Sequence, residues 1–148
     1  MVSVRKANKT DIPAMSRVLT ASITSLCIED HGNDSGRLHQ WTKNKSEEGV
    51  GEMMDNPDQT VWVAEVSGEV AAVGAVAGDS IVLNYVAPEH RFRGVSKALL
   101  ATMEVSLRDA GISLGKLVST RTALRFYLAS GWSELGPGAG GIRMEKIL

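Results

Sequence analysis

Apolar residues recur with two different periods along the first part of the chain. Val2 and Val4 alternate with polar residues, which predicts a short strand. Thr10 or Asp11 is suited to cap a following helix, whose first turn tolerates Pro13. One face of that amphipathic helix is formed by residues three or four positions apart, namely Ile12, Met15, Leu19, Ser22 and Leu26. We therefore expect a strand followed by a helix.

Short segments with turn residues between them occupy the middle of the chain. Residues 31–36 have the composition of a loop, and 56–58 that of a turn. Between these we expect one or two short helices, over residues 37–46 and 47–54. Three runs rich in β-branched or apolar residues then predict strands at 60–66, 70–77 and 81–86. The connections between them are only a few residues long, which favours antiparallel pairing.

The last third of the chain returns to helical spacing and then to strands. A helix is predicted over residues 94–110, ending at Gly111, and a second over 122–130, ending at Gly131. The strands predicted here are 116–119, 132–135 and 142–147, and a flexible glycine-rich connection is predicted at 136–141. This order of elements is that of a mixed α/β (α+β) fold in one domain, residues 1–148, with no internal repeat.

Composition narrows the class of protein. The chain has 148 residues, of which 43% are hydrophobic, and 16 Lys and Arg nearly balance 17 Asp and Glu. This balance argues against a nucleic-acid-coating protein. No run is long enough to span a membrane, and the N-terminus lacks an apolar signal run, so we expect a cytoplasmic protein. The single cysteine, Cys27, is interpreted as a buried structural thiol.

Cations gather where a predicted strand ends and a helix begins. Arg91 and Arg93 lie in the connecting loop, and Lys97 lies in the first helical turn. Cations are unfavourable at a helix N-terminus unless an anion joins them, and free backbone N–H groups there already favour an anion. Gly94 allows a bulky phosphate to approach the backbone. Together these features predict a polyphosphate cradle.

Other interpretations of the glycines and cations are weaker. A solvated basic loop is the plain alternative to a cradle. A Walker phosphate loop is excluded, because its Gly-x-x-x-x-Gly-Lys-Ser/Thr pattern is absent. Residues 136–141 match Gly-x-Gly-x-x-Gly, but they open no helix and too little chain follows for a dinucleotide-binding unit.

Two motifs, in order, resemble those of the GNAT superfamily of N-acetyltransferases. Arg91-x-x-Gly94-x-Ser96 resembles the acetyl-CoA motif Gln/Arg-x-x-Gly-x-Gly/Ala. The segment 120–132, with Ala123, Phe126-Tyr127 and Gly131-Trp132, resembles the later motif Asn-x-x-Ala-x-x-Phe-Tyr followed by Gly-Phe. The resemblance covers nearly the whole chain. Ser96 and Thr120 depart from the usual Gly/Ala and Asn.

The resemblance implies a fold, a donor and a mechanism. The expected sheet is mostly antiparallel, flanked by helices and splayed near the end of its fourth strand. The donor would be acetyl-CoA, with no metal, and an amine would attack the thioester directly in a ternary complex. Tyr127 would be the general acid that protonates the leaving thiolate. The donor-binding residues implied are Tyr85, Val86, Arg91, Phe92, Arg93, Gly94, Val95, Ser96, Lys97, Thr120 and Phe126.

The acceptor and the general base stay open. The acceptor would be a small-molecule amine or a protein amino group, with residues 30–54 lining its side. The candidate bases, each more typical of a solvated surface group, are Glu29, Asp30, His31, Glu65 and Asp79. Packing is the preferred role for His39 and Trp41. We keep a non-catalytic acyl-CoA-binding module as the alternative function, and both a monomer and a homodimer as assemblies.

Overall fold

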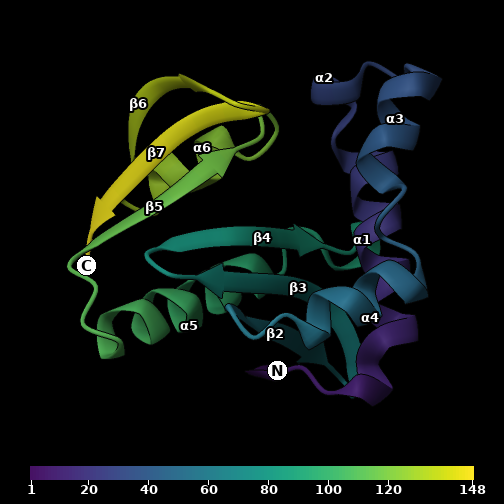
Figure 1. Cartoon of the computed structure of the whole chain (residues 1–148), viewed down its shortest axis with the longest axis horizontal. Coiled ribbons are helices and arrows are strands. Elements are labelled where there is room, and N and C mark those ends of the chain that lie inside the picture. The colour runs from purple at the N-terminus through teal and green to yellow at the C-terminus, as the bar shows by residue number, and fades with distance from the viewer.

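A seven-stranded sheet organises the computed structural model, which describes residues 1–148 (Figure 1). The strand order is β1-β2-β3-β4-β5-β7-β6. Every neighbouring pair is antiparallel except β4–β5, which is parallel. The strands are β1 (Val2–Lys6), β2 (Gln59–Val66), β3 (Glu69–Ala77), β4 (Ser80–Val86), β5 (Leu114–Ser119), β6 (Ser133–Gly138) and β7 (Gly141–Ile147). The expected mixed, mostly antiparallel sheet is confirmed.

The first helix follows β1 as predicted, and a short capped turn precedes it. A short 3-10 turn, η1 (Lys9–Asp11), precedes α1 (Ile12–Leu26). The capping side chain is that of Asn8, which accepts from the Thr10 N–H, while Asp11 accepts from the Asn8 N–H in return. Asp11, one of the two residues predicted to cap α1, does occupy the N-cap position of that helix, but its side chain bonds to Asn8 in the extra turn and not to α1.

Three short helices follow α1, and the two later ones were predicted, over residues 37–46 and 47–54. They are α2 (Ile28–His31), α3 (Ser35–Thr42) and α4 (Glu47–Asp55). The loop predicted at 31–36 was too long. His31 closes α2, and α3 begins one residue after Asp34, whose carboxylate accepts from the Arg37 N–H. An Asp at this position caps a helix, so the polar run marks a helix boundary.

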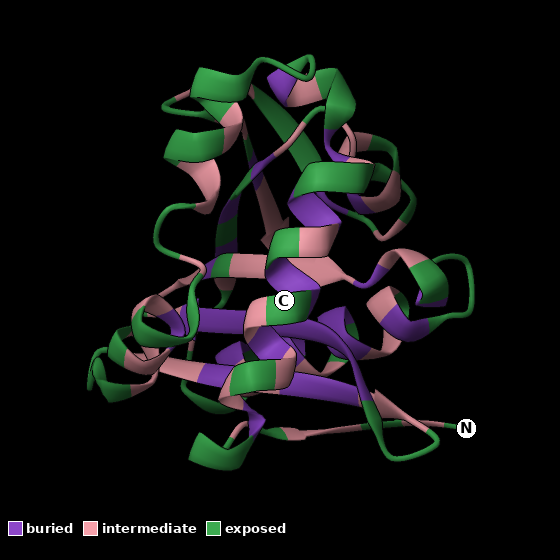
Figure 2. Ribbon diagram, turned by 90° about the vertical axis from the view of Figure 1, so that its right-hand side faces the viewer, coloured by how far each residue is buried: buried purple, intermediate pink, exposed green.

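Helices cover both faces of β2–β4, and the central strand β3 is therefore buried continuously from Val70 to Val76. On one face, Met15 and Leu19 of α1 pack with Val73 of β3. On the other, α5 (Val95–Asp109) packs against β3, where the absence of a side chain at Gly74 leaves room for Met103. Figure 2 shows burial concentrated in the central strands and on the inward faces of the helices. None of the helices has the length and apolar character needed to cross a membrane.

The C-terminal part forms its own corner of the sheet. Helix α6 (Leu124–Ala129) follows β5, and β6 and β7 form a hairpin beyond it. Residues 136–141 were predicted as a flexible connection. In the structure Gly136 and Pro137 pair with β7, and only Ala139 and Gly140 lie outside the strands. The glycines therefore belong to a tight hairpin.

The sheet splays between β4 and β5. These strands pair only at Ser80 with Lys116 and Ile81 with Leu117, at the start of β4. The rest of β4 leads away from β5 to the 3-10 turn η2 (Pro88–His90). Figure 1 shows the two strands diverging toward the side where α2 and α3 lie. The predicted splay near the end of the fourth strand is confirmed.

Candidate active site

A cleft of about 920 Å³ occupies the space between the diverging strands. Its walls are β4, β5, the N-terminus of α5 and the residues around α6. Val82 on one wall and Val118 on the other keep 50% and 51% of their surface exposed. Every residue predicted to bind the donor lines this cleft except Arg93, which is exposed outside it. A volume of this size suits an extended organic ligand.

The N-terminus of α5 opens onto the cleft with its backbone donors free. Gly94 is the N-cap residue, with φ of 78°, and it offers no side chain to cap the helix. The N–H groups of Val95, Ser96 and Lys97 therefore have no backbone or side-chain acceptor in the protein. The first turn contains no acidic residue. The result is a positive helix end that an anion would complete.

The exposed side chains of Arg91 and Phe92 lie beside this positive end. The Arg91 guanidinium lies 4.6 Å from the centre of the Phe92 ring. Phe92 adopts the left-handed backbone conformation, with φ of 66°, and leaves 91% of its surface exposed. A non-glycine residue with positive φ is uncommon and marks a constrained turn. That turn directs Arg91 and Phe92 to the mouth of the cleft.

Tyr127 lies at the base of the cleft with its hydroxyl held by one partner. The Tyr127 oxygen accepts a hydrogen bond of 2.9 Å from Asn84 Nδ2. Its ring packs edge-on against Phe126 and Trp132, at centroid distances of 5.3 Å and 6.1 Å. Burial raises the pKa of Tyr127 to about 12, and the Asn84 bond opposes this only in part. The hydroxyl is therefore protonated at neutral pH.

The loop between β5 and α6 is fixed by hydrogen bonds across the open end of the splay. Thr120 Oγ1 accepts from the Ala123 N–H at 3.1 Å, so this hydroxyl stabilises the entry to α6. The Asp30 carboxylate, from α2, accepts from the Arg121 N–H at 2.7 Å and from Thr122 Oγ1 at 2.8 Å. The Asp30 bonds connect α2, at one edge of the cleft, to the loop that follows β5 on the other side.

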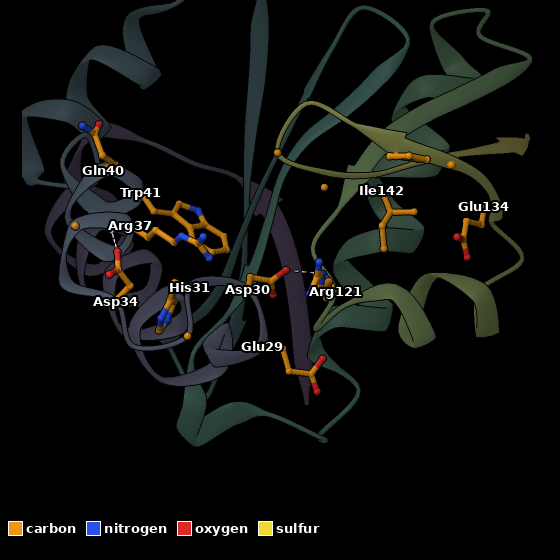
Figure 3. A pocket seen from close by; sticks show the side chains of 16 residues that line it. Glu29, Asp30, His31, Asp34, Arg37, Gln40, Trp41, Arg121, Glu134 and Ile142 are labelled. Atoms are coloured by element: carbon orange, nitrogen blue, oxygen red, sulfur yellow. Dashed lines mark hydrogen bonds between the residues drawn. The ribbon is translucent and has the colours of Figure 1, made fainter.

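A second cavity of about 1180 Å³, lined mainly by polar and charged residues, adjoins the cleft and is called the polar cavity. Glu29 and Arg121 border both spaces. Figure 3 shows its side chains converging from two sides, with Arg37 and Trp41 from α3 on one and Ile142 from β7 on the other. Its remaining labelled residues are Asp30, His31, Asp34, Gln40 and Glu134. The lining suits a polar ligand that enters beside the cleft.

The sequence matches a family model described as an acetyltransferase (GNAT) domain, over residues 27–144. The chain belongs to the GNAT acetyltransferase family. No curated protein matches the sequence closely.

Solved GNAT structures share the fold of this GNAT domain along its whole length. One is the PaiA N-acetyltransferase from Thermoplasma acidophilum in complex with coenzyme A, with a TM-score of 0.82 at 17% identity, covering 100% of this chain and 99% of that one. A GCN5-related N-acetyltransferase from Rhodopseudomonas palustris gives a TM-score of 0.84 at 19% identity, with coverage of 99% and 95%. The ribosomal-protein-S18-alanine N-acetyltransferase from Escherichia coli gives 0.67 at 18%, with coverage of 99% and 94%.

Four of the five candidate bases in this GNAT domain are committed elsewhere. Glu65 pairs with Arg5, and Asp79 lies 3.3 Å from Lys116, both away from the two cavities. Asp30 accepts the bonds described above. His31 was expected at the surface, but it is buried: Nδ1 accepts from the Asn33 N–H at 3.0 Å, and Nε2 lies 2.9 Å from the Ile23 carbonyl.

The His31 geometry settles its tautomer, and it leaves Glu29 as the remaining base candidate. Because Nδ1 accepts a proton, Nε2 must carry one and donate it to Ile23. No nitrogen of His31 is then free to take a proton. Glu29 is exposed and is the one candidate base that borders both cavities.

Trp41 and His39, both from α3, differ in their contacts: Trp41 is packed and His39 is exposed. Trp41 packs edge-on against His31 with centroids 6.1 Å apart, and its indole N–H donates to the Tyr85 hydroxyl at 3.2 Å. Burial raises the pKa of Tyr85 to about 12. His39 is exposed, so the packing role preferred for it is wrong.

Asn84 is the site residue that sequence analysis missed. It is the only amide within the apolar run 81–86, which is an unusual place for an unpaired polar side chain. Successive strand residues point to opposite faces, so Asn84 and Tyr85 face opposite sides of β4. Asn84 meets Tyr127, and Tyr85 meets Trp41. The polar residue in an apolar strand was the available signal.

Proposed function

We propose that this GNAT domain transfers an acetyl group from acetyl-CoA to a primary amine by direct attack in a ternary complex. The observation that carries the proposal is one cleft that joins a positive helix end to a buried, protonated tyrosine. Acetyl transfer needs both, since the donor carries phosphates at one end and releases a thiolate at the other.

The donor is proposed to bind along β4. Its pyrophosphate lies at the free N–H groups of Val95 to Lys97 with Arg91 beside it, where charge-assisted hydrogen bonds form. The pantetheine arm follows residues 82–86, whose backbone on the β5 side has no strand partner. A main-chain N–H near Val86 then polarises the thioester carbonyl as an oxyanion donor. Val82 and Val118 supply apolar contact in between.

Tyr127 is proposed to protonate the departing sulfur. The amine nitrogen forms a bond to the acetyl carbon, the C–S bond breaks, and the Tyr127 proton passes to the thiolate to give CoA. Asn84 donates to the Tyr127 oxygen, so the tyrosine's own hydrogen is not used in that bond and is available to the sulfur. The proton released by the attacking amine restores the hydroxyl through solvent.

The acceptor is proposed to enter through the polar cavity. An alkyl ammonium must lose a proton before it attacks, since its pKa is near 10. Glu29 borders both cavities. We propose that its carboxylate attracts the ammonium and accepts its proton through a water molecule. Two solved relatives bear names that refer to a ribosomal-protein alanine and to an aminoglycoside. Protein amino groups and small-molecule amines therefore both stay in the proposal.

Tyr127→Phe in single turnover tests this mechanism. The variant keeps the ring against Trp132 and loses only the hydroxyl, so CoA affinity and thermal stability should remain near those of the wild type. The chemical step should slow by about 100-fold, in the lower part of the range for general acid catalysis. Asn84→Ala is the matched second variant, since it keeps the acid and removes its partner, and its rate should fall less.

Two results would contradict the assignment. A wild-type rate in Tyr127→Phe would reduce the residue to packing. A slow rate with an equal loss of CoA affinity would make it a positioning residue. Single-turnover conditions are needed because product release can otherwise hide the chemical step.

A further inference from the structure

A buried imidazole without partners lies at the other end of the loop that leads to the helix α5. His90 ends η2 and is 8% exposed. Neither of its ring nitrogens has a hydrogen-bond partner in the protein, and both are closed to solvent. Imidazole nitrogens donate or accept hydrogen bonds, and leaving both unpaired in the interior costs free energy. Such a pair of groups indicates a missing ligand.

Two carboxylates lie against this imidazole. His90 Nε2 is 3.8 Å from Glu69 Oε1, and one ligand atom from each of Glu69, Glu89 and His90 lies within 4.8 Å of the others. The sheet brings them together. Antiparallel pairing places Ala72 opposite Val86, and the start of β3 therefore runs beside η2. Residues some twenty positions apart in sequence become neighbours in this way.

We propose that Glu69, Glu89 and His90 form a binding site for a divalent cation of the zinc class. Imidazole and carboxylate together suit zinc, with bonds of about 2.0–2.2 Å. Two such bonds can span the 3.8 Å between His90 Nε2 and Glu69 Oε1 at an angle of roughly 120–145°, wider than tetrahedral, so the exposed carboxylates would close on the ion when it binds. A direct hydrogen bond cannot, because 3.8 Å exceeds its range. Three protein ligands would leave a fourth position for water.

The position of the site gives it a structural consequence. His90 immediately precedes Arg91, the first residue of the cradle, and Glu69 begins β3. A cation held by both would join the β2–β3 hairpin to the start of the cradle loop. It lies outside both cavities, since none of the three ligands lines either one. The site is therefore independent of the proposed acetyl transfer and takes no part in its chemistry.

Calorimetric titration of zinc ions into chelator-treated protein tests the proposal. The wild type should bind one equivalent and gain thermal stability from it. Glu69→Gln and His90→Gln should each lose at least about tenfold in zinc affinity, as loss of a ligand predicts. Glu69 is 57% exposed, so its variant should fold even if the His90 variant does not. His39→Gln, which removes an exposed histidine outside the cluster, should bind zinc as the wild type does.

Each remaining result counts against the site. Absence of a zinc-binding heat in the wild type overturns it. Unchanged zinc affinity in Glu69→Gln overturns it as well. A loss in His39→Gln equal to that in Glu69→Gln would show adventitious binding to surface groups. Cobalt substitution adds a further measurement, because intense visible absorption of the cobalt protein would report the same low-coordinate site.

Discussion

At the scale of single residues, the environment of Tyr127 fixes the state of its proton. The side chain is buried, and its oxygen receives a hydrogen bond from Asn84. Burial disfavours the charged phenolate, which is why the pKa of the hydroxyl rises to about 12. An acid with a raised pKa keeps its proton over the whole range in which the acceptor amine loses its own. The two groups therefore need not compete for one narrow pH range.

The pH profile of acetyl transfer follows from this pKa. The single-turnover rate at fixed total amine should rise toward an amine pKa of about 10, because only the neutral amine attacks. Ionisation of Tyr127, with its pKa raised to about 12, should cause no fall below that region. Rates measured from pH 6 to about pH 10.5 check this. A decline already near neutral pH that is absent in Tyr127→Phe would contradict the assignment.

The same shift has a defined sign for stability. Tyr127 titrates near 10 when unfolded and near 12 when folded. Its contribution to the free energy of unfolding is therefore complete below pH 10 and is lost as the pH rises toward 12. Thermal denaturation of the wild type should become more alkali-sensitive across that interval than that of Tyr127→Phe.

At the scale of secondary-structure elements, the N-terminus of α5 is the feature that most restricts which ligand the cleft can bind. Its first-turn N–H groups are free, it has no acid in that turn, and Arg91 and Lys97 line the adjoining cleft. Repulsion between these cations and the positive helix end is offset only when an anion binds. The unbound element is therefore destabilised locally, which supports its proposed role as the pyrophosphate site.

Arg91→Ala should weaken CoA binding by about tenfold or more, since one charge-assisted hydrogen bond to phosphate is lost. Arg91 is exposed, so the thermal midpoint of the free protein should hardly change. Arg108→Ala, in the last turn of the same helix, is the matched control and should bind CoA normally. Calorimetric titration with CoA measures both. Equal affinities in Arg91→Ala and the wild type would remove the cradle assignment.

A test of Gly94 needs a replacement residue that tolerates the left-handed backbone conformation at this position. A Cβ there would meet nothing within 4 Å, but φ of 78° strains a β-branched residue. Gly94→Val would therefore mix backbone strain with the loss of close phosphate approach. Asn tolerates this conformation, so Gly94→Asn should keep most of the thermal stability and still lose CoA affinity. If Gly94→Asn binds CoA as the wild type does, the glycine is needed only for the turn.

At the scale of the whole molecule, the sheet is two units joined at a narrow seam. Strands β1–β4 lie between α1 and α4 on one face and α5 on the other, while β5, β7 and β6 form the second unit. Only two residue pairs join β4 to β5. The Asp30 bonds to Arg121 and Thr122 form a second connection, at the open end. Strand pairing therefore joins the two units at the closed end of the cleft, and the Asp30 hydrogen bonds join them at its open end.

Much of this architecture could be predicted from the chain, because long periodic segments fix their own structure. The spacing of Met15 and Leu19 predicted α1, and the run 81–86 predicted β4. Short polar segments were less predictable. The run 31–36 contains both the end of α2 and the cap of α3, and the glycines of 136–141 were compatible with either a loop or a hairpin.

The individual side chains of the site were predictable only where a motif named them. Arg91, Gly94 and Tyr127 lie in the two motifs, and all three line the cleft. The partner of Tyr127 and the burial of His31 depend on distant parts of the chain, which strand register and helix packing bring together. No local pattern in a single sequence contains that information.

We propose above all that this chain catalyses acetyl transfer to an amine. The most direct measurement is release of free CoA thiol from acetyl-CoA across a panel of small amines and N-terminal peptides, with the acetylated product identified by mass. We expect amine-dependent thiol release, with one acetylated amine formed for each CoA. Tight CoA binding without amine-dependent release from any member of the panel would contradict it, and would favour a non-catalytic acyl-CoA-binding module.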